Sequence, residues 1–184
     1  MAGLLNNAIS TQLTQWFPNS ALLKTWEPSI APPLVEESLK FGLALVIIYL
    51  SRTKSIWSAL GIGLGVGLGF ELSEDYTYTL STMLTPSGHP IPEAISRLES
   101  IIASHWLLTA LMTTAVLLLY WKQSSAKSLL LYALAPLVLH ILWNSSFGEN
   151  LLFKVALTIV SWIICISLYI TQIKTIDTKI PQTP

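Results

Sequence analysis

Residues 56–80 read IWSALGIGLGVGLGFELSEDYTYTL, and this stretch decides the fold class. The run is long enough to cross a bilayer, which takes about 20 mostly apolar residues. It also holds three carboxylates within five positions, at Glu71, Glu74 and Asp75. An ionisable group inside a span costs about 2.5–3.5 kcal/mol at mid-helix, so it persists where it faces water, a partner or an ion. We therefore expect a membrane helix that carries part of a polar site.

The composition agrees with a membrane protein. Of the 184 residues, 52% are hydrophobic and 11% are charged, and the mean hydropathy is +0.60. Soluble domains carry roughly 25% charged residues. The net charge is zero without a basic tract, which argues against a nucleic-acid partner. The single cysteine, Cys165, excludes a disulfide framework and a cysteine-based metal site.

Working outward from residues 56–80, apolar runs predict an all-α, polytopic integral membrane bundle of about five transmembrane helices. The expected spans are about 33–50, 56–80, 98–121, 129–147 and 151–173. Three prolines in residues 86–92 predict a loop.

These runs divide the chain into three parts. Residues 1–32 form an N-terminal interfacial helix or a loosely ordered tail, 33–174 form the transmembrane domain, and 175–184 form a cytoplasmic tail.

Basic residues predict the orientation in the membrane. In a five-span topology, six of them fall on one side: Arg52, Lys54, Lys122, Lys127, Lys174 and Lys179. Three fall on the other side: Lys24, Arg97 and Lys154. The positive-inside rule then places the N-terminus outside and the C-terminus in the cytoplasm of a multi-pass cell-membrane protein.

Five glycines alternate along residues 61–69, but no Gly-Lys-Ser/Thr follows them, so they do not form a nucleotide loop. On a helix they form two stripes, one of Gly61, Gly65 and Gly69 and one of Gly63 and Gly67. Small-xxx-small stripes let membrane helices approach closely. We expect both stripes to pack against neighbouring helices.

Polar residues interrupt the other spans as well. They are Glu36, Glu37 and Lys40 in the first, His105 in the third, and His140 with Asn144 in the fourth. At 1.5 Å per residue, these groups and Glu74 share a layer roughly 5–12 Å below the outer surface. Because apolar runs and Lys/Arg counts set the topology, this common depth is an independent indication of one site.

Each cluster also has a structural interpretation. Glu36, Glu37 and Lys40 can form surface ion pairs, the carboxylates of residues 71–75 can lie at a wet helix end, and a buried histidine is often only hydrogen-bonded. The functional interpretation joins them. Two histidines and a carboxylate with an open position suit zinc, and a nearby glutamate can act as general base toward a peptide carbonyl. Asn144 can orient a substrate or stabilise an oxyanion.

Four motifs, in order along residues 34–147, resemble those of the PrsW family of intramembrane metalloproteases, within the CAAX-protease and bacteriocin-processing superfamily. The family's E-E-x-x-K is matched by Glu36, Glu37 and Lys40, and its G-F-x-x-x-E-N-x-x-Y by Gly69, Phe70, Glu74, Asp75 and Tyr78, with Asp in place of Asn. An Arg before a His in a span is matched by Arg97 and His105, and H-x-x-x-N by His140 and Asn144. Glu71 stands where the family usually has a small residue.

This resemblance implies an all-α membrane protease acting on a membrane-protein substrate within the lipid bilayer. It implies zinc ligands at Glu74, His105 and His140. It also implies a general base at Glu36 or Glu37 assisted by Asn144, with Lys40, Asp75, Tyr78 and Arg97 in support. Spacing does not decide between the two glutamates, and the superfamily pattern favours Glu36. Two alternatives remain: a non-catalytic relative that binds membrane partners in immunity or assembly, and a cation or proton transporter.

Overall fold

The regular structure is helical throughout the residues that the computed structural model describes, 2–121 and 126–173, so the predicted all-α class is confirmed for them. The main helices are α1 (Ala2–Trp16), α2 (Ala21–Ser51), α3 (Ile56–Met83), α4 (Pro90–Ser100), α5 (His105–Tyr120), α6 (Ala126–Trp143) and α7 (Leu151–Leu168). Short helices follow three of them: Ile101–Ala103, Ser146–Glu149 and the π-helical turn Tyr169–Ile173.

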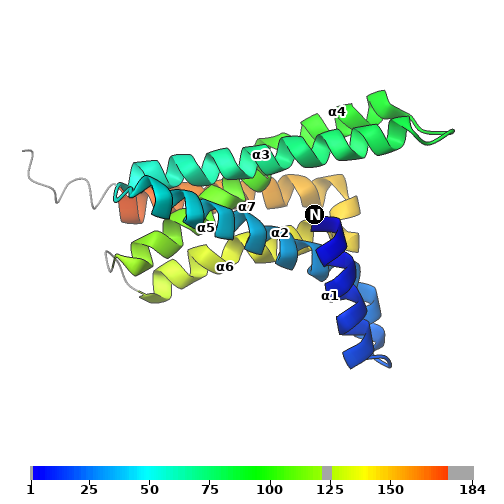
Figure 1. Ribbon diagram of the computed structural model, residues 1–184, viewed down its shortest axis with the longest axis horizontal. Helices are drawn as coiled ribbons and strands as arrows, with labels where there is room; N and C mark the ends of the chain where they lie inside the picture. The colour runs from blue at the N-terminus through cyan, green and yellow to red at the C-terminus, as the bar shows by residue number, and fades with distance from the viewer. Residues whose placement is uncertain (1, 122–125, 174–184) are drawn as a thin grey trace, which may run out of the picture.

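Helix α5 is the centre of the bundle. Buried residues occur on every side of it, from Leu107 to Leu118, because α3, α6, α7 and the second half of α2 all pack around it. Figure 1 shows α4 folded back along α3, and α1 standing out from the bundle beside the first turns of α2. The core therefore lies where polar residues of several helices can meet.

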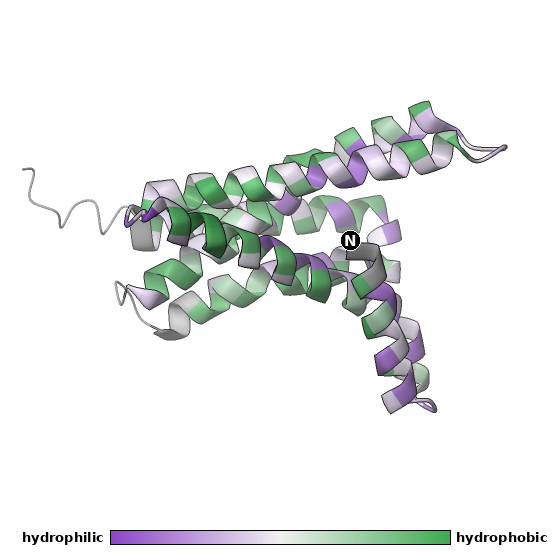
Figure 2. Ribbon diagram, in the orientation of Figure 1, coloured by the Kyte–Doolittle hydropathy of each residue, from purple (hydrophilic) through white to green (hydrophobic). Residues whose placement is uncertain are grey.

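Among the residues that the structure describes, two helices are long and apolar enough to cross a membrane, as judged by length and composition: residues Ile56–Met83 and Leu151–Thr171. Two shorter apolar helices, His105–Tyr120 and Leu130–Trp143, lie beside them. A membrane helical bundle fits these observations, but the predicted number of about five spans is not confirmed. The hydrophilic residues of α3 gather in its second half, next to α4 (Figure 2).

The predicted third span, 98–121, is wrong as one continuous helix. Helix α4 ends at Ser100 and α5 begins at His105, because Ser104 has a non-helical backbone with φ −120° and ψ −150°. His105 is therefore the first residue of a helix, and not two turns inside one. Residues 98–106 contain no proline or glycine that would mark this break in the sequence.

The helix bounds differ from the predictions at three further places, two of which involve prolines. The predicted loop at residues 86–92 is wrong at its end, since α4 begins at Pro90 and proline is tolerated in the first helical turn. Helix α2 begins at Ala21, where the Ser20 hydroxyl accepts a hydrogen bond from the Leu23 N–H at 3.1 Å. It then continues through three prolines, Pro28, Pro32 and Pro33, so the predicted start of the first span at residue 33 is wrong. The fourth predicted span, 129–147, ends early, at Trp143.

The predicted parts of the chain are only partly described. The segment 1–32 contains α1, which packs against α2, and its placement at a membrane interface stays a prediction. The predicted tail, 175–184, lies outside the described residues. So do Lys122, Lys174 and Lys179, which carry much of the orientation argument, and the orientation therefore stays a prediction.

The two glycine stripes of α3 have opposite surroundings. A Cβ atom added at Gly63 would lie 2.7 Å from Ala110 Cα, and one at Gly67 would lie 2.5 Å from His105 O and Trp106 Cα. This stripe packs against α5, as predicted. The other stripe, Gly61, Gly65 and Gly69, has no atom within 4 Å of an added Cβ, so the predicted packing is wrong there.

Candidate functional site

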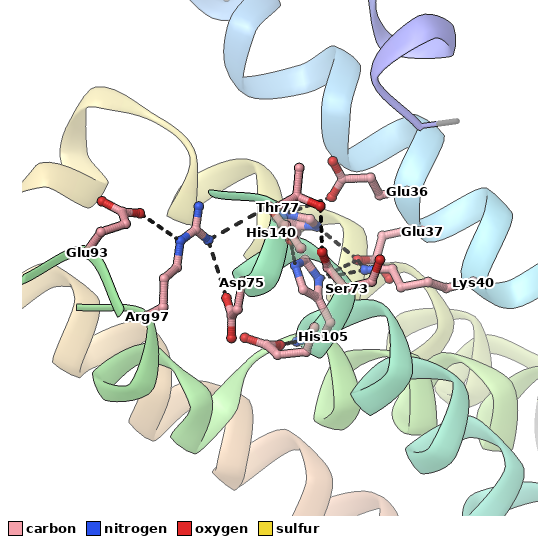
Figure 3. Close-up of polar contacts among 12 residues, drawn as sticks. Glu36, Glu37, Lys40, Ser73, Asp75, Thr77, Glu93, Arg97, His105 and His140 are labelled. Atoms are coloured by element: carbon pink, nitrogen blue, oxygen red, sulfur yellow. Dashed lines mark hydrogen bonds and ion pairs between the residues drawn. The ribbon is translucent and has the colours of Figure 1, made fainter. Parts of the chain in front are cut away.

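Four helices bring buried and half-buried polar side chains to one point, shown in Figure 3. The contributors are Glu36, Glu37 and Lys40 from α2, Glu71 and Glu74 from α3, His105 from α5, and His140 from α6. Glu37 and Lys40 are each only 2% exposed, although both carry charge. Burying charged groups is costly unless they are paired, and the pairs within this cluster supply that compensation.

His105 is placed by its position at the start of α5. Its backbone N–H donates to Glu71 Oε2 at 3.1 Å, and the Glu71 side chain is buried. The first N–H groups of a helix lack intrahelical partners, and a carboxylate there also meets the positive end of the helix dipole. One turn earlier, Gly67 lets α3 approach the backbone of His105. Glu71 and Gly67 therefore fix where this imidazole enters the site.

The His105 ring is held at both nitrogens. Nδ1 lies 2.6 Å from Lys40 Nζ, and Nε2 lies 2.7 Å from Glu74 Oε2. A lysine ammonium only donates, so Nδ1 accepts from Lys40 and the Nε2–H group donates to Glu74. Lys40 Nζ also donates to Glu37 Oε1 at 2.6 Å. These contacts define both the tautomer and the direction of the ring.

The His140 ring has one nitrogen engaged and one facing the centre. Nδ1 lies 2.8 Å from Glu37 Oε1, while Nε2 lies 3.8 Å from Glu36 Oε2. A histidine that binds a metal usually donates its other N–H to a carboxylate, which orients the ring. His140 and Glu37 have this arrangement, with Nε2 available as a ligand atom.

Three donor groups lie close enough to hold a metal ion. One ligand atom each from Glu36, His105 and His140 lies within 4.8 Å of the other two. Ligands about 2.0–2.2 Å from a tetrahedral zinc lie roughly 3.3–3.6 Å from one another. A small contraction would therefore complete the set, once the His105 nitrogen that binds the metal gives up its present contact with Lys40 or Glu74. Two imidazoles and a carboxylate with a fourth position free are the ligands of a catalytic zinc, so these residues fit one.

Glu74 lies beside this group. Its Oε2 accepts from His105, and its Oε1 lies 3.8 Å from Arg97 Nη1. The structure thus brings Glu74 to the centre, but the compact donor group contains Glu36 where the sequence-based prediction had Glu74.

Arg97 and its partners form an adjoining cluster. The Arg97 guanidinium lies 3.8 Å from Asp75 Oδ1, 3.2 Å from Glu93 Oε1, and 3.8 Å from the centroid of the Tyr78 ring. Burial lowers the pKa of Arg97, but the Glu74 carboxylate and the hydrogen bond to Glu93 outweigh burial, so its pKa is raised. Arg97 is a fixed positive charge that ties α4 to the acidic half of α3.

Asn144 lies one residue beyond the end of α6 and is exposed. Its backbone carbonyl accepts from the Ser29 hydroxyl at 3.0 Å, and the residue lines the polar cavity described below. Its predicted assistance in catalysis stays a prediction.

Two features of the site were missed in the sequence. Asn6 of α1 lines both cavities together with Glu36, and its Oδ1 is buried without a partner. Nothing in the polar pattern of residues 1–32 distinguishes Asn6. Glu71 was expected as one of three carboxylates of the polar site, but its contact with the start of α5 was missed. Its spacing of four from Gly67 was the available signal that it faces the same neighbour.

Two cavities meet at this centre. One, of about 660 Å³, is lined mainly by polar side chains, including His105, His140 and Arg97. The other, of about 900 Å³, is a mainly apolar groove between α2 and α3. Both are lined by Asn6, Glu36, Glu74 and Tyr78. The candidate site therefore lies between a polar and an apolar approach.

Comparison with known proteins agrees with this geometry. Residues 1–170 match the model of a family described as PrsW family intramembrane metalloprotease. No curated protein and no solved structure matches the chain. Because the family model covers most of the chain, the protein belongs to the PrsW family of intramembrane metalloproteases. It is therefore a membrane protein, and membership supports a metal-dependent hydrolase of peptide bonds.

Proposed function

We propose that this PrsW-family protein is a membrane-embedded endopeptidase that hydrolyses a peptide bond in a transmembrane or juxtamembrane segment of another membrane protein. The observation that carries the proposal is the compact group of Glu36, His105 and His140, placed where a polar cavity meets an apolar groove. Hydrolysis inside a membrane needs water and an apolar chain at the same point, and this arrangement offers both.

Zinc is the metal that these ligand types favour. His105 and His140 supply two ligands, and one carboxylate completes the set. The close grouping of donor atoms favours Glu36 as that carboxylate. The assignment that the sequence suggested, with Glu74 as ligand and Glu36 as base, is the alternative.

When bound, zinc lowers the pKa of a water to about 7 and polarises a carbonyl. The protein's own groups then have defined tasks. Glu74 lines both cavities and lies outside the compact donor group, so it can accept a proton from water and pass it to the leaving amine. Glu37 accepts a hydrogen bond from the Nδ1–H group of His140 and so orients that ring. Lys40 holds Glu37 and balances the buried negative charge.

Paired amide substitutions test these roles. Wild type, Glu36→Gln and Glu74→Gln are purified, and zinc content is measured together with cleavage of a quenched fluorescent reporter that carries an apolar transmembrane segment. Glu27→Gln, on the same helix as Glu36 and outside the site, is the control. We expect Glu36→Gln to lose zinc and activity. Glu74→Gln should keep zinc and lose about 10²–10⁴ in rate, as is typical when a general base is removed.

Other outcomes reassign the roles. If Glu74→Gln loses zinc and Glu36→Gln keeps it, the two carboxylates exchange functions. A zinc-loaded wild type that cleaves no reporter would favour a non-catalytic relative that binds membrane partners. A wild type that takes up no metal would contradict the proposal as a whole.

A further inference from the structure

The groove between α2 and α3 has apolar walls along most of its length. Leu43 and Ile47 line it from α2, and Ile62 and Val66 line it from α3. Leu43 is 53% exposed, so its side chain faces outward. The volume, about 900 Å³, is at the upper end of ligand pockets, which span roughly 300–1,000 Å³.

Glycines leave part of the α3 surface without side chains. Gly65 and Gly69 line the groove, and no atom lies within 4 Å of a Cβ built at either. A helix surface of this kind admits another chain at short distance, as small-residue stripes do between membrane helices. These two glycines therefore give the groove a bare backbone floor.

The groove ends at the candidate metal centre, because Glu36, Lys40 and Glu74 also line it. Ser73 and Thr77 line the same end, and Figure 3 shows both next to the centre. A helix must unwind before one of its peptide bonds can be hydrolysed, and the freed N–H and C=O groups then need polar partners. The Thr77 hydroxyl donates to the Ser73 carbonyl oxygen at 2.7 Å and can still accept a hydrogen bond from a peptide N–H group. The Ser73 hydroxyl can donate to or accept from a peptide, whereas an acyl chain would have no use for either group.

We propose that this groove is the docking site for the apolar segment of the protein substrate, with Gly65 and Gly69 as its floor and Ser73 and Thr77 at the end where the segment unwinds. The proposal rests on the proposed function, since it assigns the route by which a membrane segment reaches Glu36 and Glu74. Water reaches the same residues through the polar cavity on the other side.

Photo-crosslinking tests docking without requiring hydrolysis. Benzoylphenylalanine replaces Leu43, which lines the groove, or Leu50, which lies seven residues further along α2 and outside it. The probe is a fluorescent, lysine-flanked peptide of leucine and alanine, long enough to span a membrane, in detergent micelles. Each crosslinker is combined with Gly65→Leu or with Gly61→Leu. Gly61 is the matched control, since it has the same open surroundings and does not line the groove.

We expect crosslinking from position 43, with little from position 50. Gly65→Leu should reduce the yield about tenfold, because the added side chain occupies the space of the docked segment. Gly61→Leu should leave the yield unchanged. Equal yields in Gly65→Leu and Gly61→Leu, or no peptide crosslink from position 43, would overturn the proposal. So would crosslinking of a photoactivatable fatty acid, and not of the peptide, from position 43.

The two proposals fail separately. If the protein crosslinks the peptide as expected but never cleaves a reporter, the proposed docking groove stands and the proposed protease activity is wrong. If wild type and Gly65→Leu cleave the reporter at the same rate, the proposed protease activity stands and the proposed docking groove is wrong.

Discussion

Helix α3 has two faces made of the same residue at the same spacing, with opposite surroundings. On the closed face, Ala59, Gly63, Gly67 and Glu71 recur at every fourth position, and all are buried. On the open face, Gly61, Gly65 and Gly69 meet nothing within 4 Å. The spacing of small residues thus indicates a smooth helix surface. Whether that surface is packed or left open depends on the neighbouring helix.

The two faces also have different relations to the candidate site. The closed face brings α5 close and ends at Glu71, which binds the first N–H group of that helix and so fixes His105. The open face borders the groove and leads toward Ser73 and Glu74. One face holds a proposed metal ligand rigidly, and the other leaves space for a substrate.

Adding a side chain to the closed face should cause the largest loss of stability. In Gly67→Leu, the new Cβ would lie 2.5 Å from backbone atoms of His105 and Trp106, which cannot move as a side-chain end can. We expect a loss of about 3 kcal/mol or more in the free energy of unfolding, at the upper end for overpacked cores. Thermal unfolding in detergent and zinc content should both show the damage. A Gly67→Leu protein with wild-type stability would mean that α3 and α5 are not packed in this way.

Removing the metal should have the next largest effect. At a zinc concentration of about 100 times Kd, a bound ion stabilises a folded protein by about 2.7 kcal/mol. Chelation should therefore lower the melting temperature of the wild type and of Gly65→Leu. Gly67→Leu should respond weakly, because displacing His105 already weakens the site.

His140→Ala is the control for chelation. It removes a proposed ligand, so its melting temperature should be the same with and without chelator. An equal response to chelator in His140→Ala and wild type would place the metal elsewhere.

Features of the fold and the site that depend on residue spacing could be predicted from the sequence. Apolar runs predicted most of α3, α6 and α7 and the second half of α2. The E-E-x-x-K and H-x-x-x-N patterns named the α2 and α6 residues that lie against each other. Glu37 and His140, for example, are far apart in the chain and 2.8 Å apart in space.

Features that depend on a neighbouring element were beyond sequence reasoning. The break before His105 has no proline or glycine to mark it. Gly63 and Gly65 are equivalent in composition and spacing, and only the position of α5 separates them. Asn6 lines the site together with Glu36 because α1 packs against α2, which no local pattern in residues 1–32 specifies.

Removing the hydrogen bond between Glu71 of α3 and the first residue of α5, without adding volume, should have an intermediate effect on stability and on zinc binding. Glu71→Ala removes the acceptor for the His105 N–H group, and losing such a cap typically costs about 0.5–2 kcal/mol. Because the same tie orients a proposed ligand, zinc affinity should fall roughly 10–100-fold, as for other groups that orient metal ligands.

Glu71→Gln is the control for this change, since its amide oxygen can still accept the hydrogen bond. Zinc titration and thermal unfolding should show recovery of most of both losses in Glu71→Gln. If Glu71→Ala lowered stability and left zinc affinity intact, the residue would have a purely structural role.

The smallest effect should come from filling the open face. Gly65→Leu places a larger side chain two residues from Gly67, on the same helix, yet no atom lies within 4 Å of its Cβ. Substitutions away from packed features usually change stability by no more than about 0.5 kcal/mol, and replacing a helical glycine removes a conformational cost of roughly 0.5–1 kcal/mol. We therefore expect Gly65→Leu to unfold at or slightly above the wild-type temperature and to bind zinc normally. A loss of stability approaching that of Gly67→Leu would show that the open face is packed after all, by another helix or a second copy of the chain, and would remove the groove as a route to Glu36.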